Sequence, residues 1–369
     1  MSIIIYMKTM CRSDFMKKRI IILWTMIFMI GITAGCSIDS NKDNSNIDAE
    51  NIQEETIYIP DYYPFKKNTV MYYSGEGNEY AEKKSYFEYI GNNRAQQKIL
   101  NPGTNMVSIL EYKDGELKEI YSEEEFYNIE NLLNVDEEKN TVILKEPLNV
   151  GASWTLPDGT KRTITGSNVA IETPLREFKA LEVTTQMGED KVEKDYYAKG
   201  IGLVASIYND GETEIKTLLE KIEENAPLVQ NMRFYYILNS GEKIVYTQND
   251  IGFKTNEGIE KLFENGFKNP PSEKLISPIS QNTAINKINF DKKNRTVKVD
   301  FSNELTEEMN AGSNFEAQII KSIVNTFGDY YDADKIYIST EGVPYSTGHF
   351  QLREGEFFSV EEKDVEEFK

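Results

Sequence analysis

His349 is the only histidine in the sequence, and this limits the acid–base and metal chemistry open to the protein. A zinc site built on histidines needs several imidazoles, so a multi-histidine metal centre is excluded. A Ser-His-Asp relay would need an oriented serine and an oxyanion hole, and no Gly-x-Ser-x-Gly segment occurs. We therefore predict that the chain is not an enzyme and has no catalytic residue, and we expect His349 at the surface or at a sheet edge.

Acidic residues are abundant, but their spacing indicates no site. The chain has 61 Asp and Glu against 41 Lys and Arg, a formal charge of −20. Proteins that bind duplexes neutralise phosphates with Lys and Arg, so we expect no nucleic-acid partner. Asp329, Asp332 and Asp334 lack the glycine and terminal glutamate of an EF-hand, which favours a polar loop over a calcium site. We predict neither a metal nor a cofactor.

The glycine pairs at 75–77 and 200–202 indicate turns rather than a phosphate-binding loop. Neither pair is followed by a third glycine and a helix, which a dinucleotide-binding motif requires. The aromatic residues between 58 and 89 offer another kind of site. Core packing explains most of them, and a cleft for a partner strand or a lipidic ligand is the alternative.

A basic and then apolar segment near the N-terminus indicates export. Lys17, Lys18 and Arg19 precede an apolar run over 20–35, shorter than the roughly 20 residues that span a bilayer. The run ends in Thr33-Ala34-Gly35-Cys36, which resembles a bacterial lipobox. The resemblance implies cleavage between Gly35 and Cys36 and a diacylglyceryl group on Cys36, with acyl chains such as palmitate. An uncleaved anchor is the alternative.

We therefore interpret 1–35 as a signal peptide starting at Met16, with 1–15 an upstream start that the cell does not use. Residues 36–56 are predicted to be the lipidated cysteine and a flexible tether, because they contain few large apolar residues. Cys11 and Cys36 are the two cysteines, so the mature chain is expected to have no disulfide. The predicted location is the outer face of the cell membrane, held by the diacylglyceryl anchor.

Short alternating apolar runs over 57–225 predict an antiparallel β domain. About ten such runs are separated by turn signals such as Asp114-Gly115 and Asp210-Gly211, which favours a curved sheet or open barrel. Residues 123–133 are the exception and are predicted as a short helix. Residues 221–225 are charged and are expected to be a linker.

The pattern changes after Pro227 to a mixed α/β domain over 230–352, so the fold class is α+β. Helices are predicted over 256–267 and from Ser313, which with Glu316 forms a capping-box pattern. A half-buried strand is predicted over 295–301. The acidic tail, 353–369, is expected to fray.

This second domain resembles the GerMN domain of sporulation and spore germination proteins. The matching segments include Val299-Asp300-Phe301-Ser302 and Ile323-Val324-Asn325-Thr326, and the likeness covers about residues 230–350. The first domain looks like a β domain that precedes GerMN in clostridial-type lipoproteins. Stretches such as Gly151-Ala152-Ser153-Trp154 and Asp195-Tyr196-Tyr197 carry that likeness.

The resemblance implies a non-catalytic lipoprotein of the cell envelope. It would act in spore formation or germination by protein–protein assembly with envelope or sporulation proteins. Two alternatives stay open. The β domain could bind a hydrophobic or cell-wall-derived ligand, or the protein could be an accessory to surface signalling.

Overall fold

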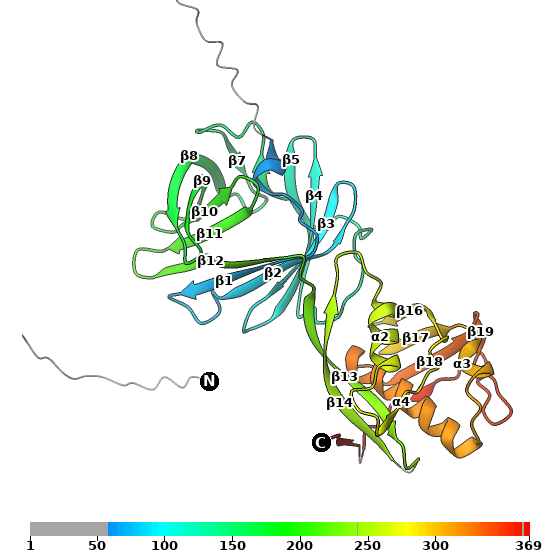
Figure 1. The fold of residues 1–369 in the computed structure, drawn as a ribbon. Helices are drawn as coiled ribbons and strands as arrows, with labels where there is room; N and C mark the ends of the chain where they lie inside the picture. Colours follow the sequence, from blue (N-terminus) through cyan, green and yellow to red (C-terminus); the bar gives the residue numbers. More distant parts are fainter. Residues whose placement is uncertain (1–57, 242, 364) are drawn as a thin grey trace, which may run out of the picture. The chain divides into compact units, whose positions relative to one another are not determined.

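A computed structural model describes residues 58–241, 243–363 and 365–369 (Figure 1). The predictions for the signal peptide, Gly35, Cys36 and the tether lie outside the described residues. Among the helices within the described ranges, none has the length and apolar composition needed to cross a bilayer.

The first part of the described chain is an antiparallel sheet of twelve strands, here called the N-terminal sheet. Their order is β6-β5-β4-β3-β2-β1-β12-β11-β10-β9-β8-β7. This confirms the predicted antiparallel β architecture. The strands are β1 (Thr69–Glu76), β2 (Lys83–Ile90), β3 (Arg94–Leu100), β4 (Asn105–Lys113), β5 (Glu116–Glu124), β6 (Thr141–Lys145), β7 (Ser153–Thr155), β8 (Lys161–Glu172), β9 (Glu177–Gln186), β10 (Val192–Ala198), β11 (Gly202–Asn209) and β12 (Glu214–Glu224).

The N-terminal sheet curls until its two edge strands approach each other. The buried indole N–H of Trp154, on β7, donates a 2.9 Å hydrogen bond to the carbonyl of Val142, on β6. Antiparallel sheets often manage unpaired edges by curling toward closure. The sheet is therefore a nearly closed barrel, and this hydrogen bond crosses its seam.

The concave face of this sheet is covered by residues 58–68, here called the strap. The strap contains the short helix α1 (Ile59–Tyr62). Ile59, Tyr62, Tyr63 and Phe65 pack into the same apolar cluster as Trp154, and the Phe65 ring stacks on Tyr112 with centroids 4.3 Å apart. The strap therefore supplies core side chains that the strands themselves lack.

The predicted helix over 123–133 is wrong: this stretch is the end of β5 followed by a loop. Buried side chains of β3 take up the loop's backbone groups. Lys98 donates to the Asn128 carbonyl at 3.0 Å. Gln96 donates to the Glu130 carbonyl and accepts from the Leu132 amide, both at 2.7 Å. Backbone groups satisfied in this way do not need a helix.

Lys98 and Glu88 form an ion pair whose side chains have no exposed surface. Their Nζ and Oε1 atoms are 3.7 Å apart, and Gln96 donates to the other Glu88 oxygen at 2.7 Å. Burial raises the pKa of Glu88 and lowers that of Lys98, which disfavours both charged forms. The attraction between the two side chains opposes this effect and favours the charged form of each.

The predicted linker at 221–225 is also wrong, because residues up to Glu224 belong to β12, paired with β1 along its length. After it the chain forms two smaller sheets, of orders β15-β13-β14-β21 and β16-β17-β18-β19, with β20 also paired to β18. Their strands are β13 (Leu228–Leu238), β14 (Ile244–Phe253), β15 (Leu275–Ile276), β16 (Ile285–Asp291), β17 (Thr296–Phe301), β18 (Lys335–Thr340), β19 (Val343–Pro344), β20 (Phe358–Ser359) and β21 (Glu366–Glu367).

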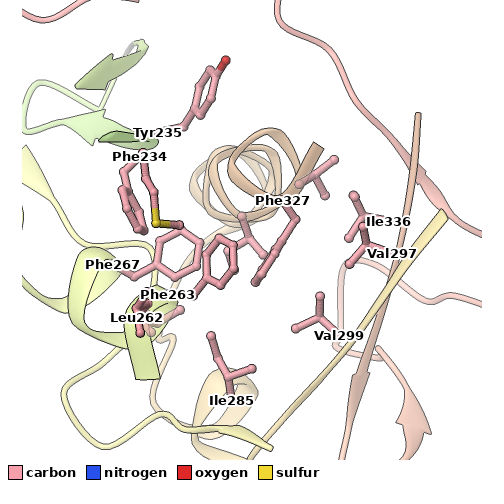
Figure 2. Packing of buried hydrophobic residues seen from close by; sticks show 14 of the residues in the cluster. Phe234, Tyr235, Leu262, Phe263, Phe267, Ile285, Val297, Val299, Phe327 and Ile336 are labelled. Atoms are coloured by element: carbon pink, nitrogen blue, oxygen red, sulfur yellow. The ribbon is translucent and has the colours of Figure 1, made fainter. Parts of the chain in front are cut away.

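Helices α2 (Ile259–Lys268), α3 (Glu304–Glu307) and α4 (Ser313–Tyr331) complete this part. β17 and β18 run parallel on either side of the α4 crossover, which makes the fold mixed α/β as expected. Figure 2 shows Phe327 of α4 between the aromatic rings of α2 and the valines of β17. The centroids of Phe327 and Phe263 are 4.4 Å apart.

Helix α4 begins where predicted but without the predicted capping box. Its N-cap is Gly312, and no side chain caps it. Glu316 is buried instead and accepts hydrogen bonds from Tyr345 at 2.7 Å and Thr347 at 2.5 Å. A carboxylate held by two hydroxyls in this way does not reach back to the helix start.

The acidic tail does not fray as expected; it packs against the fold. Asn325 exchanges two hydrogen bonds with the Glu361 backbone, at 2.8 and 3.0 Å. Gly328 makes room for Val360, since a Cβ there would lie 2.4 Å from the valine. Apolar residues between the acids explain the docking, and they are Phe358, Val360, Val365 and Phe368.

We predict that Lys98→Met destabilises the protein by roughly 3–5 kcal/mol, because it leaves the Glu88 carboxylate buried and unpaired. Urea unfolding measures the change. The double variant Glu88→Gln/Lys98→Met should recover most of the loss, and Lys113→Met, at an exposed position of β4, should change stability little. If Lys98→Met is as stable as the wild type, the Glu88 carboxylate does not need Lys98 to offset the cost of burying its charge.

Candidate binding site in the N-terminal sheet

The residues that the sequence analysis considered for catalysis or metal binding do not form a common site within the described residues. His349 is exposed in a turn, where its amide donates to Thr347 Oγ1 at 3.2 Å. The predicted surface position is confirmed. Gly35 and Cys36 lie outside the described residues, so cleavage and lipidation stay predictions.

The three aspartates at the C-terminal end of α4, Asp329 within the helix and Asp332 and Asp334 after it, pair with arginines. Arg295 binds Asp332 at 2.6 Å and Asp334 at 2.9 Å, and Arg233 binds Asp329 at 2.6 Å. Hydrogen bonds from Arg295 hold the pKa of Asp332 and Asp334 below the ordinary value. Within the described ranges, no group of three or more His, Cys, Asp or Glu side chains could hold a metal ion.

The Val299–Ser302 segment stabilises a turn and a strand end. One Asp300 oxygen accepts from Ser339 at 2.6 Å and from the Gly342 amide at 2.7 Å. Ser302 accepts from the Ala284 amide at 2.9 Å. Partial burial opposes the Asp300 charge, but hydrogen bonds from Ser339, Gly342 and Asn286 outweigh it and lower the Asp300 pKa. The polar side chains of this motif therefore accept hydrogen bonds from other parts of the same domain.

The Ile323–Thr326 segment has a similar structural role. Asn325 holds the tail, as described above. Thr326 accepts from the Tyr235 amide at 3.0 Å and donates to the Ser322 carbonyl at 2.8 Å. Asn325 and Thr326 thus join α4 to the tail and to β13.

The N-terminal sheet contains a cavity of about 70 Å³ on its concave face. It lies between strands β1 to β3, the strap and the start of β11. Side chains that share one face of the three strands form its wall, and they are Thr69, Met71, Tyr73, Lys83, Ser85, Phe87, Gln97 and Ile99. Tyr63, Pro64 and Lys66 of the strap cover it, and Tyr86 of β2 together with Ile201, Gly202 and Leu203 completes the lining.

Lys83 gives this cavity a positive charge. Its ammonium lies 5.3 Å from the centroid of the Tyr73 ring and has no hydrogen bond or ion pair with any described residue. Burial lowers the Lys83 pKa, while Asp195 and Glu193 act to raise it. Asp195 is itself paired with Arg162. Lys66, the other cation of the lining, pairs with Glu224 at 3.8 Å, and none of the lining residues is acidic.

The polar groups beside Lys83 are ordered. Gln97 donates to Ser85 Oγ at 2.7 Å and accepts from the Tyr63 hydroxyl at 3.2 Å. Tyr73 donates to the Leu203 carbonyl at 3.0 Å. Burial raises the pKa of Tyr63 to about 12, so its hydroxyl stays protonated at neutral pH.

The aromatic residues between 58 and 89, for which core packing and a cleft were the two interpretations, contribute to both a core and a cavity. Tyr62, Tyr73, Tyr86, Phe87 and Tyr89 are buried, and Tyr63, Tyr73, Tyr86 and Phe87 line the cavity. Sequence reasoning missed Lys83, Ser85 and Gln97. Their signal is the alternation of β2, which places Lys83, Ser85 and Phe87 on one face, but the partners across β1 and β3 depend on the pairing register.

Comparison with known protein families identifies a matching family for the C-terminal part of the chain. Residues 233–346 match the Germane family, described as sporulation and spore germination. The resemblance predicted for about residues 230–350 is confirmed. The match covers the strands, helices and both motifs described above, from β13 to β19. No curated protein matches the chain.

Solved structures give weaker likenesses. The tandem GerMN domains of the sporulation protein GerM from Bacillus subtilis are 17% identical, with TM-score 0.30, over 37% of this chain and 48% of that one. The chain thus spans about half the length of that structure. The first GerMN domain of the same protein is 17% identical over 37% of this chain and 99% of that one, with TM-score 0.28. A protein with a YmcC-like fold from Bacteroides fragilis is 12% identical over 44% and 99%, with TM-score 0.27. The assignment rests on the family match.

We predict that Asp300→Ala lowers the free energy of unfolding by about 1–3 kcal/mol at pH 7, because the Ser339 hydroxyl and Gly342 amide lose their acceptor. The Asp300 pKa is below its ordinary value near 4. Its contribution is therefore complete above pH 4 and is lost as the pH falls through the lower pKa of the folded state. Chemical unfolding between pH 2 and 7 should show the gap to wild type narrowing on acidification. Asp136→Ala, at an exposed position, is the control; a gap independent of pH would contradict this role.

Proposed function

We propose that the protein is a lipid-anchored, non-catalytic lipoprotein on the outer face of the cell membrane that acts in spore formation or germination. It works by assembling with other envelope or sporulation proteins. The observation that carries this proposal is the Germane match over residues 233–346. The anchor rests on the lipobox resemblance at Cys36.

The contacts of the Germane segment, residues 233–346, are consistent with a role in recognition. Asp300, Asn325 and Thr326 hold its own backbone, and the three aspartates at the C-terminal end of α4 bind arginines. Its outer surface is left to make contacts with other proteins. Val343, on β19, is 61% exposed there.

Deleting the gene in its source organism tests the biological role. We expect fewer heat-resistant spores or slower germination, restored by the wild-type gene and not by Cys36→Ala, which lacks the thiol for the acyl chains. Spore counts and germination curves measure the effect. Full spore yield and normal germination in the deletion strain would reject the sporulation role.

Photo-crosslinking tests the assembly directly. A photoreactive residue at Val343 should give specific adducts to envelope or sporulation proteins in sporulating cells. The matched position is Val150, 57% exposed in the turn between β6 and β7. Equal adducts at both positions, or none at Val343, would contradict assembly through the Germane segment.

A further inference from the structure

The cavity of the N-terminal sheet has features of a ligand site that the Germane match does not address. It is enclosed by the strap on one side and by three strands on the other, and it is lined mainly by apolar side chains. Pockets for small molecules combine such a lining with a few placed polar groups. Here those groups are the Lys83 ammonium and the Ser85 hydroxyl.

The charge of the lining is opposite to that of the protein. The chain carries a formal charge of −20, yet the lining includes two lysines and no carboxylate. Lys66 already has Glu224 as its partner, whereas Lys83 lies against the Tyr73 ring and feels the charges of Asp195 and Glu193 without an ion pair to either. A half-buried ammonium with no carboxylate directly bonded to it gains from a bound anion, because its own solvation is incomplete.

The register of the strands gives the site a direction. Tyr73 lies opposite Lys83, Met71 and Ile99 lie on either side of Ser85, and Gln97 lies opposite Phe87. From Lys83 to Phe87 the strand advances about 13 Å. Moving along β2, the wall therefore changes from cationic, to a hydroxyl between two apolar side chains, to an aromatic ring.

We propose that this cavity binds a small monocarboxylate, with its carboxylate on Lys83 and its apolar body between Met71, Ile99 and Phe87. The Ser85 hydroxyl accepts from Gln97 and so has its own proton to donate to the carboxylate. A volume of about 70 Å³ is several times what one water needs, which suits an acid of about four to six carbons. The proposal does not rest on the sporulation role.

The size and charge of the site select the probe. 3-Methylbutanoate has a compact apolar body and one negative charge, and 3-methylbutanamide has nearly the same shape without the charge. Acetate keeps the charge without the body, and inorganic phosphate is an anion with no apolar part. Isothermal titration calorimetry of the full chain in uncharged nanodiscs measures the dissociation constants.

We expect saturable binding of 3-methylbutanoate and at least tenfold weaker binding of the amide, acetate and phosphate. Lys83→Met should raise the dissociation constant of 3-methylbutanoate by roughly 10- to 100-fold, because it removes a charged hydrogen-bond donor. Lys84→Met is the matched control: its side chain is exposed on the opposite face of β2, so binding should be unchanged.

Two further variants keep the test valid if Lys83→Met folds poorly. Lys83→Arg retains the charge and should retain binding, and Ile99→Phe should fill the cavity and abolish binding while keeping the lysine. Equal affinity for the acid and its amide, or binding unchanged in Lys83→Met, would overturn the proposal. Tighter binding of phosphate than of the carboxylate, or no saturable binding of any probe, would also overturn it.

Discussion

The strongly curved N-terminal sheet has a concave face that must be covered, and the strap covers it. Ile59, Tyr62, Tyr63 and Phe65 pack against side chains from β2, β4, β8 and β10. Buried aromatic rings remove large apolar areas from water, so these few residues account for much of that core. The curvature, the seam at Trp154 and the cavity beneath Tyr63 all depend on this covering.

Polar side chains secure the parts of the backbone that have no sheet or helix partner. Gln96 and Lys98 hold the loop after β5, and Asn325 holds the tail against α4. Asp300 holds the turn at Gly342. Each of these groups is buried or half-buried, where an unmet hydrogen bond is costly. The Germane motif residues therefore belong to this framework rather than to an exposed recognition site.

The period-two alternation of the strands and the apolar stripe of α4 made the antiparallel sheet and the mixed α/β part predictable from sequence. The errors occurred where a distant side chain replaced a local signal. Residues 123–133 look helical, but β3 takes their backbone groups. Glu316 looks like a cap, but Tyr345 and Thr347 occupy it. The cavity could not be predicted because it depends on register and bulges, such as the shift between Phe87 and Tyr89.

The strap is also the segment that a pulling force on the N-terminal side of residue 58 would load first. It is held by side-chain packing and by isolated hydrogen bonds, such as that from the Ile59 amide to Glu146 at 3.0 Å and that from the Gly200 amide to the Asp61 carbonyl at 2.6 Å. β1, which follows, is paired on both sides by β2 and β12 and resists shear along a ladder of hydrogen bonds. Tension would therefore peel the strap and uncover Lys83 before it breaks the hydrogen bonds of β1, which makes the strap the mechanically weak element of this fold.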